Sequence, residues 1–195
     1  MKKKLPLTAQ EIHELQNRIA DYDDVAAYKK LFFHFFLPLK SFSFSILKTK
    51  EIAEEVVSDV LIEIWGRRKQ LPGIEDLKMY LYVSVRNSSL RKLQQTQKTT
   101  VLSLDELEVE FASADPDAEA TLITGELAKK IELAIEQLPP QCKIIFKLAK
   151  EDKLKYKEIA VLLNISVKTI DNQLSTALKK IASVLNTSVN MPSAD

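Results

Sequence analysis

The sequence has 195 residues, a length that allows one hydrophobic core or two small ones, and 46% of the residues are apolar, so the chain is expected to fold. Its three glycines argue against a turn-rich β-sandwich and exclude a glycine-rich phosphate loop, while its single cysteine excludes an internal disulfide and argues against a cysteine-based zinc site. The formal net charge of +1 hides a strong segregation of charge along the chain. The abundance of Leu, Ile, Ala, Lys and Glu favours an all-α fold.

The N-terminal extension, residues 1–19, begins with a basic run. No apolar core follows that run, so the sequence does not predict a signal peptide. The most hydrophobic stretch, residues 31–47, is interrupted by His34, Pro38, Lys40 and several serines, and it is too short and too polar to span a bilayer. A cytoplasmic protein without direct membrane insertion is therefore expected, and the single cysteine suits a reducing compartment.

A helix is predicted across residues 52–65, because apolar residues recur there at helical spacing. Its buried stripe is expected to contain Ile52, Val56, Val57, Val60, Leu61, Ile64 and Trp65. The opposite face carries Glu51, Glu54, Glu55, Ser58, Asp59 and Ile62. Because Ile62 follows Asp59 by three residues, an apolar side chain is expected among acids. That pattern fits a docking surface, although isolated exposed isoleucines are common.

A second helix is predicted for residues 75–95, with Leu77, Tyr80, Leu81 and Val85 facing inward. Its later part, RNSSLRKLQQTQK, is basic and polar, and arginine and amide side chains there can bond to phosphates or base edges. Tyr80 and Tyr82 lie just upstream. Aromatic residues beside basic ones can bind single-stranded DNA by stacking and charge, although each tyrosine could instead pack inside the fold.

The charge pattern divides the chain into two basic blocks separated by an acidic linker. Residues 24–98 carry 13 basic and 8 acidic residues, residues 99–127 carry 8 acidic and no basic residues, and residues 128–195 carry 11 basic and 7 acidic residues. The basic blocks could approach nucleic acid, although charged helix faces are often simply solvated. We predict domains at residues 20–97 and 122–187, joined by a linker at 98–121 and followed by a tail at 188–195.

The C-terminal block is predicted to contain a helix-turn-helix. A helix carrying Leu127, Ile131, Ala134, Ile135 and Leu138 ends at Pro139, and Pro140 can occupy the first turn of the next helix. A short helix follows at 157–163. Asn164 then suits a sharp turn, because asparagine accepts left-handed backbone angles, and Ser166 suits the N-cap of the last helix.

The last helix is expected to bury Ile170, Leu174, Ala177, Leu178 and Ile181. Its predicted DNA-binding residues are Ser166, Lys168, Thr169, Asn172, Ser175, Thr176 and Lys179. Short polar and basic side chains near the start of a second helix suit readout in the major groove. Asn172 could pair with adenine, and Lys168 could contact guanine or phosphate. An ordinary helical hairpin is the structural alternative.

Ala53-Glu54-Glu55, Ser58-Asp59 and Trp65, followed by Tyr80, Leu81, Arg86 and Asn87, resemble the two signature segments of domain two in extracytoplasmic-function (ECF) sigma factors of the sigma-70 family. The resemblance covers roughly residues 28–182. It implies that Glu54, Glu55, Ser58, Asp59 and Ile62 bind core RNA polymerase at the clamp helices of its largest subunit. It also implies that Tyr82, Arg86, Asn87, Arg91 and Lys92 bind the minus-ten element of promoter DNA as it melts.

LPPQCKIIFKL followed by KEIAVLLNISVKTIDNQLSTALKKI is similar to domain four of the same family. The resemblance implies that this domain reads the minus-thirty-five element and contacts the flap of the second-largest polymerase subunit. The acidic linker resembles the connector between the two domains, and no separate domain three is visible. The family is usually regulated by an anti-sigma factor, so such a partner is expected here.

Four positions depart from the family pattern. Glu55 replaces the usual Asp and Ser58 the usual Gln, so the affinity for polymerase is expected to differ. Lys155 stands where a capping Ser or Thr is common, so the first helix of the motif is expected to start less firmly. Asn164 replaces the usual Gly.

No catalytic residue, metal ligand or cofactor is predicted, because His13 and His34 lack neighbouring acids or thiols in a catalytic pattern. In the sigma factor hypothesis, polymerase supplies the catalytic magnesium. A stand-alone helix-turn-helix regulator is one alternative, which leaves the N-terminal domain without a role. A sigma mimic that binds only an anti-sigma factor is another, and it predicts loss of DNA-contacting residues such as Arg86 and Asn172.

Overall fold

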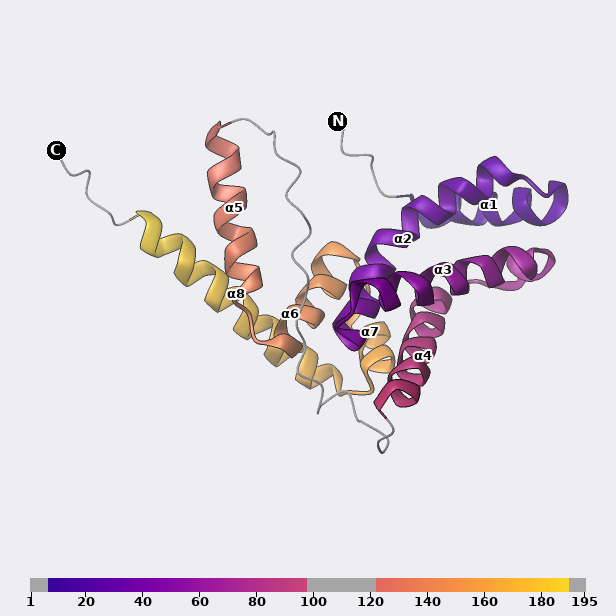
Figure 1. Cartoon of the computed structure of the whole chain (residues 1–195). Helices are drawn as coiled ribbons and strands as arrows, with labels where there is room; N and C mark the ends of the chain where they lie inside the picture. Colours follow the sequence, from indigo (N-terminus) through magenta and orange to yellow (C-terminus); the bar gives the residue numbers. More distant parts are fainter. Residues whose placement is uncertain (1–6, 98–121, 190–195) are drawn as a thin grey trace. The chain divides into compact units, whose positions relative to one another are not determined.

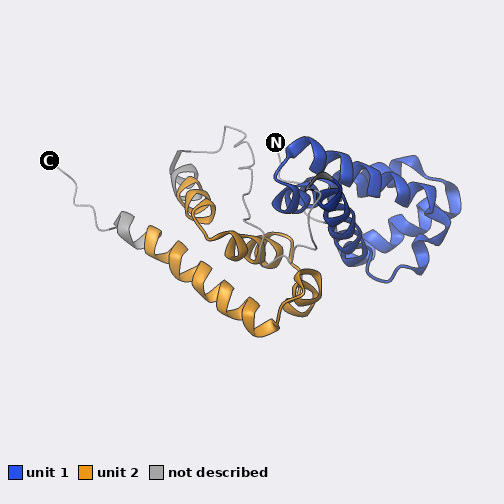
Figure 2. Cartoon of the chain, turned by 60° about the horizontal axis from the view of Figure 1, so that its bottom comes forward, with its two compact units in different colours: residues 1–101 blue, residues 102–195 orange. Residues whose placement is uncertain are grey.

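The computed structural model describes residues 7–97 and 122–189, and these form helices joined by short connections (Figure 1). The predicted all-α fold is therefore confirmed. The chain divides into two compact units, residues 1–101 and 102–195 (Figure 2). The predicted acidic linker, residues 98–121, lies outside the described residues. Within the described parts, no helix is both long enough and apolar enough to cross a bilayer.

Unit 1 contains helices α1 (Ala9–Tyr22), α2 (Val25–Leu47), α3 (Lys50–Gly66) and α4 (Leu77–Gln97), with the short 3-10 helix η1 (Arg68–Gly73) between α3 and α4. Helices α1 and α2 each start at a capping side chain. The Thr8 hydroxyl accepts from the amide of Glu11 at 3.2 Å, and the Asp24 carboxylate accepts from the amide of Ala27 at 2.9 Å. Helix α2 packs against α1, α3 and α4, so it forms the centre of this unit.

Helix α1 belongs to the core of unit 1, although most of it falls within the predicted N-terminal extension. It packs on η1 and α2 and buries Leu15 and Ile19. The buried Gln16 amide donates to two carbonyl oxygens of the following segment, Leu71 O at 2.6 Å and Ile74 O at 3.0 Å. The prediction separated this helix from the domain because bonds between residues more than fifty positions apart leave no local pattern.

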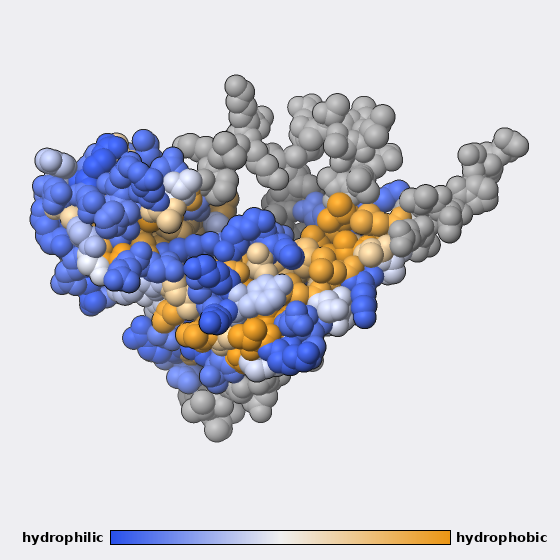
Figure 3. All heavy atoms as spheres, turned by 180° about the vertical axis from the view of Figure 1, so that it is seen from behind, coloured by the Kyte–Doolittle hydropathy of each residue, from blue (hydrophilic) through white to orange (hydrophobic). Residues whose placement is uncertain are grey.

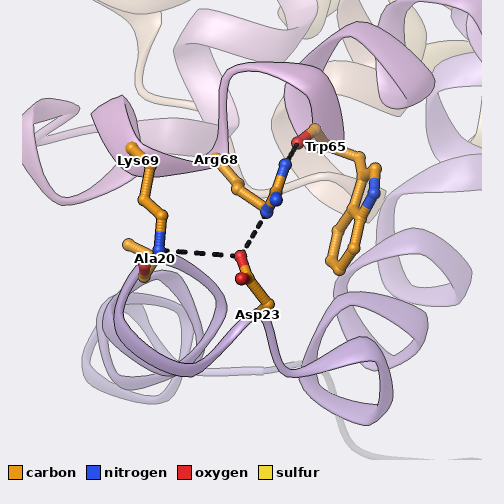
Figure 4. A network of polar contacts seen from close by, with 5 residues as sticks. All are labelled: Ala20, Asp23, Trp65, Arg68 and Lys69. Atoms are coloured by element: carbon orange, nitrogen blue, oxygen red, sulfur yellow. Dashed lines mark hydrogen bonds and ion pairs between the residues drawn. The ribbon is translucent and has the colours of Figure 1, made fainter.

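A polar network ties the end of α1 to η1 (Figure 4). Asp23, the C-cap of α1, has left-handed backbone angles and accepts a hydrogen bond from Arg68, which lowers the pKa of its carboxyl. Arg68 also stacks over Trp65, with 5.0 Å between the guanidinium carbon and the ring centre. Lys69 donates to the carbonyl of Ala20 at 2.6 Å. Because the folded pKa of Asp23 is depressed, its small stabilisation is present above the unfolded pKa and is lost as the pH falls through the folded value.

Unit 2 contains α5 (Leu122–Glu136), α6 (Pro140–Phe146), the π-helical turn η3 (Lys147–Glu151), α7 (Tyr156–Leu163) and α8 (Val167–Val189). Helices α5, α6 and α7 all pack on α8. The buried spine of α8 is Ile170, Leu174, Ala177 and Ile181.

Leu178 was predicted to be buried with this spine, but it is 50% exposed. The spine advances by four, three and four residues, so Leu178 lies beside it at the edge of the covered stripe. Together with the exposed Leu133 of α5 it adds apolar surface to unit 2, and Figure 3 shows a broad apolar area on that unit.

The Gln16 contacts predict a measurable contribution to stability. Gln16→Ala should lower the free energy of unfolding by about 1–3 kcal/mol, because the carbonyl of Ile74 loses its donor and a void remains in the core. The measurement is urea denaturation of the full chain, with Gln10→Ala on the exposed face of the same helix as the control. Equal stability of the two variants would contradict the clamping role of Gln16.

Candidate nucleic-acid and polymerase interfaces

Helix α8 presents a polar face that begins at its N-terminus. Most of the residues predicted to bind DNA are exposed on it: Ser166, Lys168, Asn172, Ser175, Thr176 and Lys179, with Thr169 half-buried. The Ser166 oxygen accepts from the Thr169 amide at 3.0 Å and lies 2.8 Å from the Thr169 hydroxyl. These two residues therefore also cap the helix, as predicted for Ser166. Lys168 and Asn172 follow at a spacing of four, so their side chains share one face and can donate outward.

The turn before α8 has the geometry expected of a helix-turn-helix. Asn164 has φ 56° and ψ 44°, which confirms the predicted left-handed conformation. The next amide, that of Ile165, bonds to the carbonyl of Ala160 at 3.1 Å and closes the end of α7. At the start of α7 the Lys155 side chain makes no cap bond, but the Glu158 carboxylate accepts from the Lys155 amide at 2.8 Å. The acid thus supplies part of the capping that Lys155 lacks.

Polar contacts from α6 hold α8 in place. The Gln173 amide donates to Gln141 at 3.0 Å, and the Cys142 thiol donates to the carbonyl of Gln173 at 3.0 Å. Burial raises the pKa of the Cys142 thiol, so the group stays protonated and can donate. Lys143 of α6 is buried and pairs with Glu136 of α5 at 2.9 Å. These contacts position the helix whose opposite face carries Lys168 and Asn172.

In unit 1, α3 exposes the acidic face that the sequence predicted. Glu54, Glu55 and Asp59 are exposed, Ser58 is half-buried, and Ile62 is 62% exposed among the acids. Two of the acids pair with neighbouring helices: Glu54 with Lys40 of α2, and Glu55 with Lys92 of α4 at 2.8 Å. A residue predicted to bind polymerase is thus joined to one predicted to bind DNA, a link that their separation by 37 positions conceals in the sequence.

The basic part of α4 exposes Asn87 and Arg91 and partly covers Arg86 and Lys92. The Arg86 guanidinium donates to the Asn87 oxygen at 3.4 Å, and Arg91 donates to Ser88 at 3.2 Å. Arg86 Nε is buried, and within the described residues it has no hydrogen-bond partner. A buried donor without a partner costs free energy.

The prediction that Tyr82 contacts DNA is wrong, because its side chain is only 1% exposed. The ring packs against Phe42 of α2, with 5.3 Å between the ring centres, and cannot receive a base. Tyr80 was expected to face inward but is 39% exposed and lies near Arg67 and Ser84. The two tyrosines flank Leu81, and Tyr82 is the one that faces Phe42 of α2. The sequence therefore placed both tyrosines wrongly.

Residues 128–181, which include α6, α7 and the spine of α8, match the family model described as sigma-70, region 4. This segment is therefore similar to region 4 of the sigma-70 family, and the predicted resemblance to domain four of that family is confirmed for these residues. Within the described residues, no group of three or more His, Cys, Asp or Glu side chains is arranged to hold a metal ion.

A solved sigma factor resembles this chain in fold. The sigma factor RpoE from Bartonella quintana, solved in complex with the anti-sigma factor NepR, has a TM-score of 0.53 and 20% identity, and the match covers 83% of this chain and 98% of that one. CnrH, solved in complex with the cytosolic domain of CnrY, has a TM-score of 0.49 and 17% identity, over 91% of this chain and 98% of that one. A search of the curated proteins gave no match.

The left-handed turn residue predicts a specific ranking of variants. Asn164→Ala should lower the free energy of unfolding by about 1 kcal/mol, because alanine is strained at a positive φ. Asn164→Gly should not lower it, since glycine adopts these angles freely. Thermal unfolding of the full chain measures both. A glycine variant less stable than the alanine variant would contradict the role of the turn.

Proposed function

We propose that this chain is a sigma factor of the ECF type, which binds core RNA polymerase and directs promoter-specific initiation of transcription. The observation that carries the proposal is the polar face of α8, presented by a helix-turn-helix inside the segment that matches sigma-70 region 4. Short polar and basic side chains at the start of a second helix are suited to the major groove. The protein supplies sequence-selective binding, and polymerase supplies the chemistry.

In this proposal unit 2 acts as domain four and reads the minus-thirty-five element. Lys168 and Asn172 are the principal candidates for base contacts, because they are exposed and share one face. Ser175, Thr176 and Lys179 extend the contact along α8, while Ser166 and Thr169 contribute at its capped start. Domain four spans residues 122–187, and it also contacts the flap of the second-largest polymerase subunit.

Unit 1 acts as domain two in the same proposal, and α1 is included with the predicted range 20–97. The exposed acids of α3 and Ile62 dock on the clamp helices of the largest polymerase subunit. Arg86, Asn87, Arg91 and Lys92 of α4 hold the minus-ten element as it opens, with Tyr80 as the candidate aromatic platform in place of Tyr82. Stacking on an exposed ring and charge on the backbone together offset the cost of unpairing.

An anti-sigma factor is the proposed regulator. The sigma factor RpoE, which has a similar fold, was solved in complex with the anti-sigma factor NepR. The apolar side chains exposed on both units, such as Ile62 and Leu178, provide surface that such a partner can cover.

Promoter-selective transcription tests the proposed function. The purified chain with core polymerase should give specific run-off transcripts from a library of promoter fragments. Lys168→Ala and Asn172→Ala should each weaken promoter occupancy by about 10- to 100-fold, because one base contact is worth about 1–3 kcal/mol. Lys129→Ala, at an exposed lysine of α5, is the matched control.

Two results would contradict this proposal. If the chain gives no specific transcript and does not associate stably with core polymerase, it is not a sigma factor. Binding to a duplex operator in the absence of polymerase would then favour the stand-alone regulator.

Ile62 offers a separate test of the polymerase surface. Ile62→Ala should weaken association with core polymerase by roughly 3- to 10-fold, because an apolar side chain that becomes covered on docking contributes about 1 kcal/mol. It should leave stability nearly unchanged, since the side chain is 62% exposed. Val25→Ala, at another exposed apolar residue of unit 1, is the control. The measurement is fluorescence titration with core polymerase, and equal affinities for the two variants would remove Ile62 from the interface.

A further inference from the structure

A cluster of lysines runs from η3 into the first turn of α7, at the start of the helix-turn-helix. Lys150, Lys153, Lys155 and Lys157 are all exposed, whereas Lys147 is mostly covered and lies 3.6 Å from Glu136. Lys155 lies 3.7 Å from Glu158. For the other three, no ion pair is recorded within residues 7–97 and 122–189. We refer to Lys150, Lys153 and Lys157 as the lysine loop.

The lysine loop is held in a defined shape. Two leucines of the surrounding segment, Leu148 and Leu154, are buried, and the Leu154 amide donates to the Leu148 carbonyl at 2.9 Å. The Asp152 amide donates to the Lys147 carbonyl at 3.0 Å, which gives the wider turn of a π-helix. Lys153 has a positive φ of 56°. Both features are uncommon, and π-turns often occur at functional sites.

The local acids do not cancel the lysines. Residues 147–158 contain five lysines and three acids, Glu151, Asp152 and Glu158. Glu158 is engaged at the start of α7, where it accepts from the Lys155 amide. The segment therefore has an excess of two positive charges, and the exposed ammonium groups are available to an anion.

The position of the loop indicates which anion it binds. It leads directly into α7, the first helix of the motif, and in helix-turn-helix proteins the first helix crosses the DNA backbone while the second enters the major groove. We propose that Lys150, Lys153 and Lys157 bind backbone phosphates of the duplex beside the site that α8 reads. The contact is electrostatic and independent of sequence, so it sets affinity and register rather than base choice. This inference rests on the proposed function for its promoter context, but the phosphate contact can be tested without it.

The test compares Lys150→Gln/Lys153→Gln with Lys129→Gln/Lys130→Gln, two exposed lysines of α5 that give the same change in charge. The full chain, alone and with core polymerase, is titrated with a promoter duplex and a non-promoter duplex at several salt concentrations. The loop variant should reduce the slope of log affinity against log salt by about 1.8, since each phosphate contact contributes roughly 0.9. Affinity for both duplexes should fall equally, and the control should keep the wild-type slope.

The outcomes separate this inference from the proposed function. A loop variant with the wild-type salt slope overturns the inference, even when the wild-type chain initiates transcription. A variant that loses association with core polymerase and keeps the slope also overturns it, and assigns the loop to a protein partner instead. If the wild-type chain gives no promoter-specific transcript, the proposed function fails. The slope of log affinity against log salt, measured for the free wild-type and variant chains on the non-promoter duplex, then still decides whether the loop binds phosphate.

Discussion

The proposed DNA-binding surface depends on the burial of one face of α8. Ile170, Leu174, Ala177 and Ile181 form its spine, and helices α5, α6 and α7 cover that spine. Because an α-helix has 3.6 residues per turn, burial of these four positions leaves Lys168 and Asn172 directed outward. The apolar contacts supply most of the stabilisation, and directed bonds such as Gln141–Gln173 fix how α8 is placed on α6.

Unit 1 follows a different arrangement, in which charged residues connect neighbouring helices at the surface. Glu54 pairs with Lys40, and Glu55 pairs with Lys92. Both pairs are largely exposed, so each is worth at most about 1 kcal/mol and can be exchanged for contacts with a partner. The proposed polymerase and DNA surfaces of this unit are therefore electrostatically linked through one side-chain pair.

Charged residues are also segregated along the chain. Each unit contains one basic block, and residues 99–127, which separate the blocks in the sequence, carry acidic and no basic residues. In unit 2 the lysines fall into two groups with different roles in our proposals. Those of α8 lie on a helix face suited to base edges, and those of the lysine loop, around the start of α7, are suited to phosphates. A net charge of +1 gives no sign of this division.

Local patterns in the sequence determined much of this protein. Helical periodicity predicted α3, α4 and α8 and the exposure of Ile62, while Asn164 and Ser166 predicted the turn and the cap, because backbone angles and caps depend on residues a few positions apart. Tertiary structure alone decided which tyrosine of α4 is covered, since that depends on Phe42 of another helix. It also placed α1 in the core through Gln16, exposed Leu178 at the edge of a spine, and paired Glu55 with Lys92. Each of these outcomes depends on where a distant segment packs, and the local sequence carries no record of that contact.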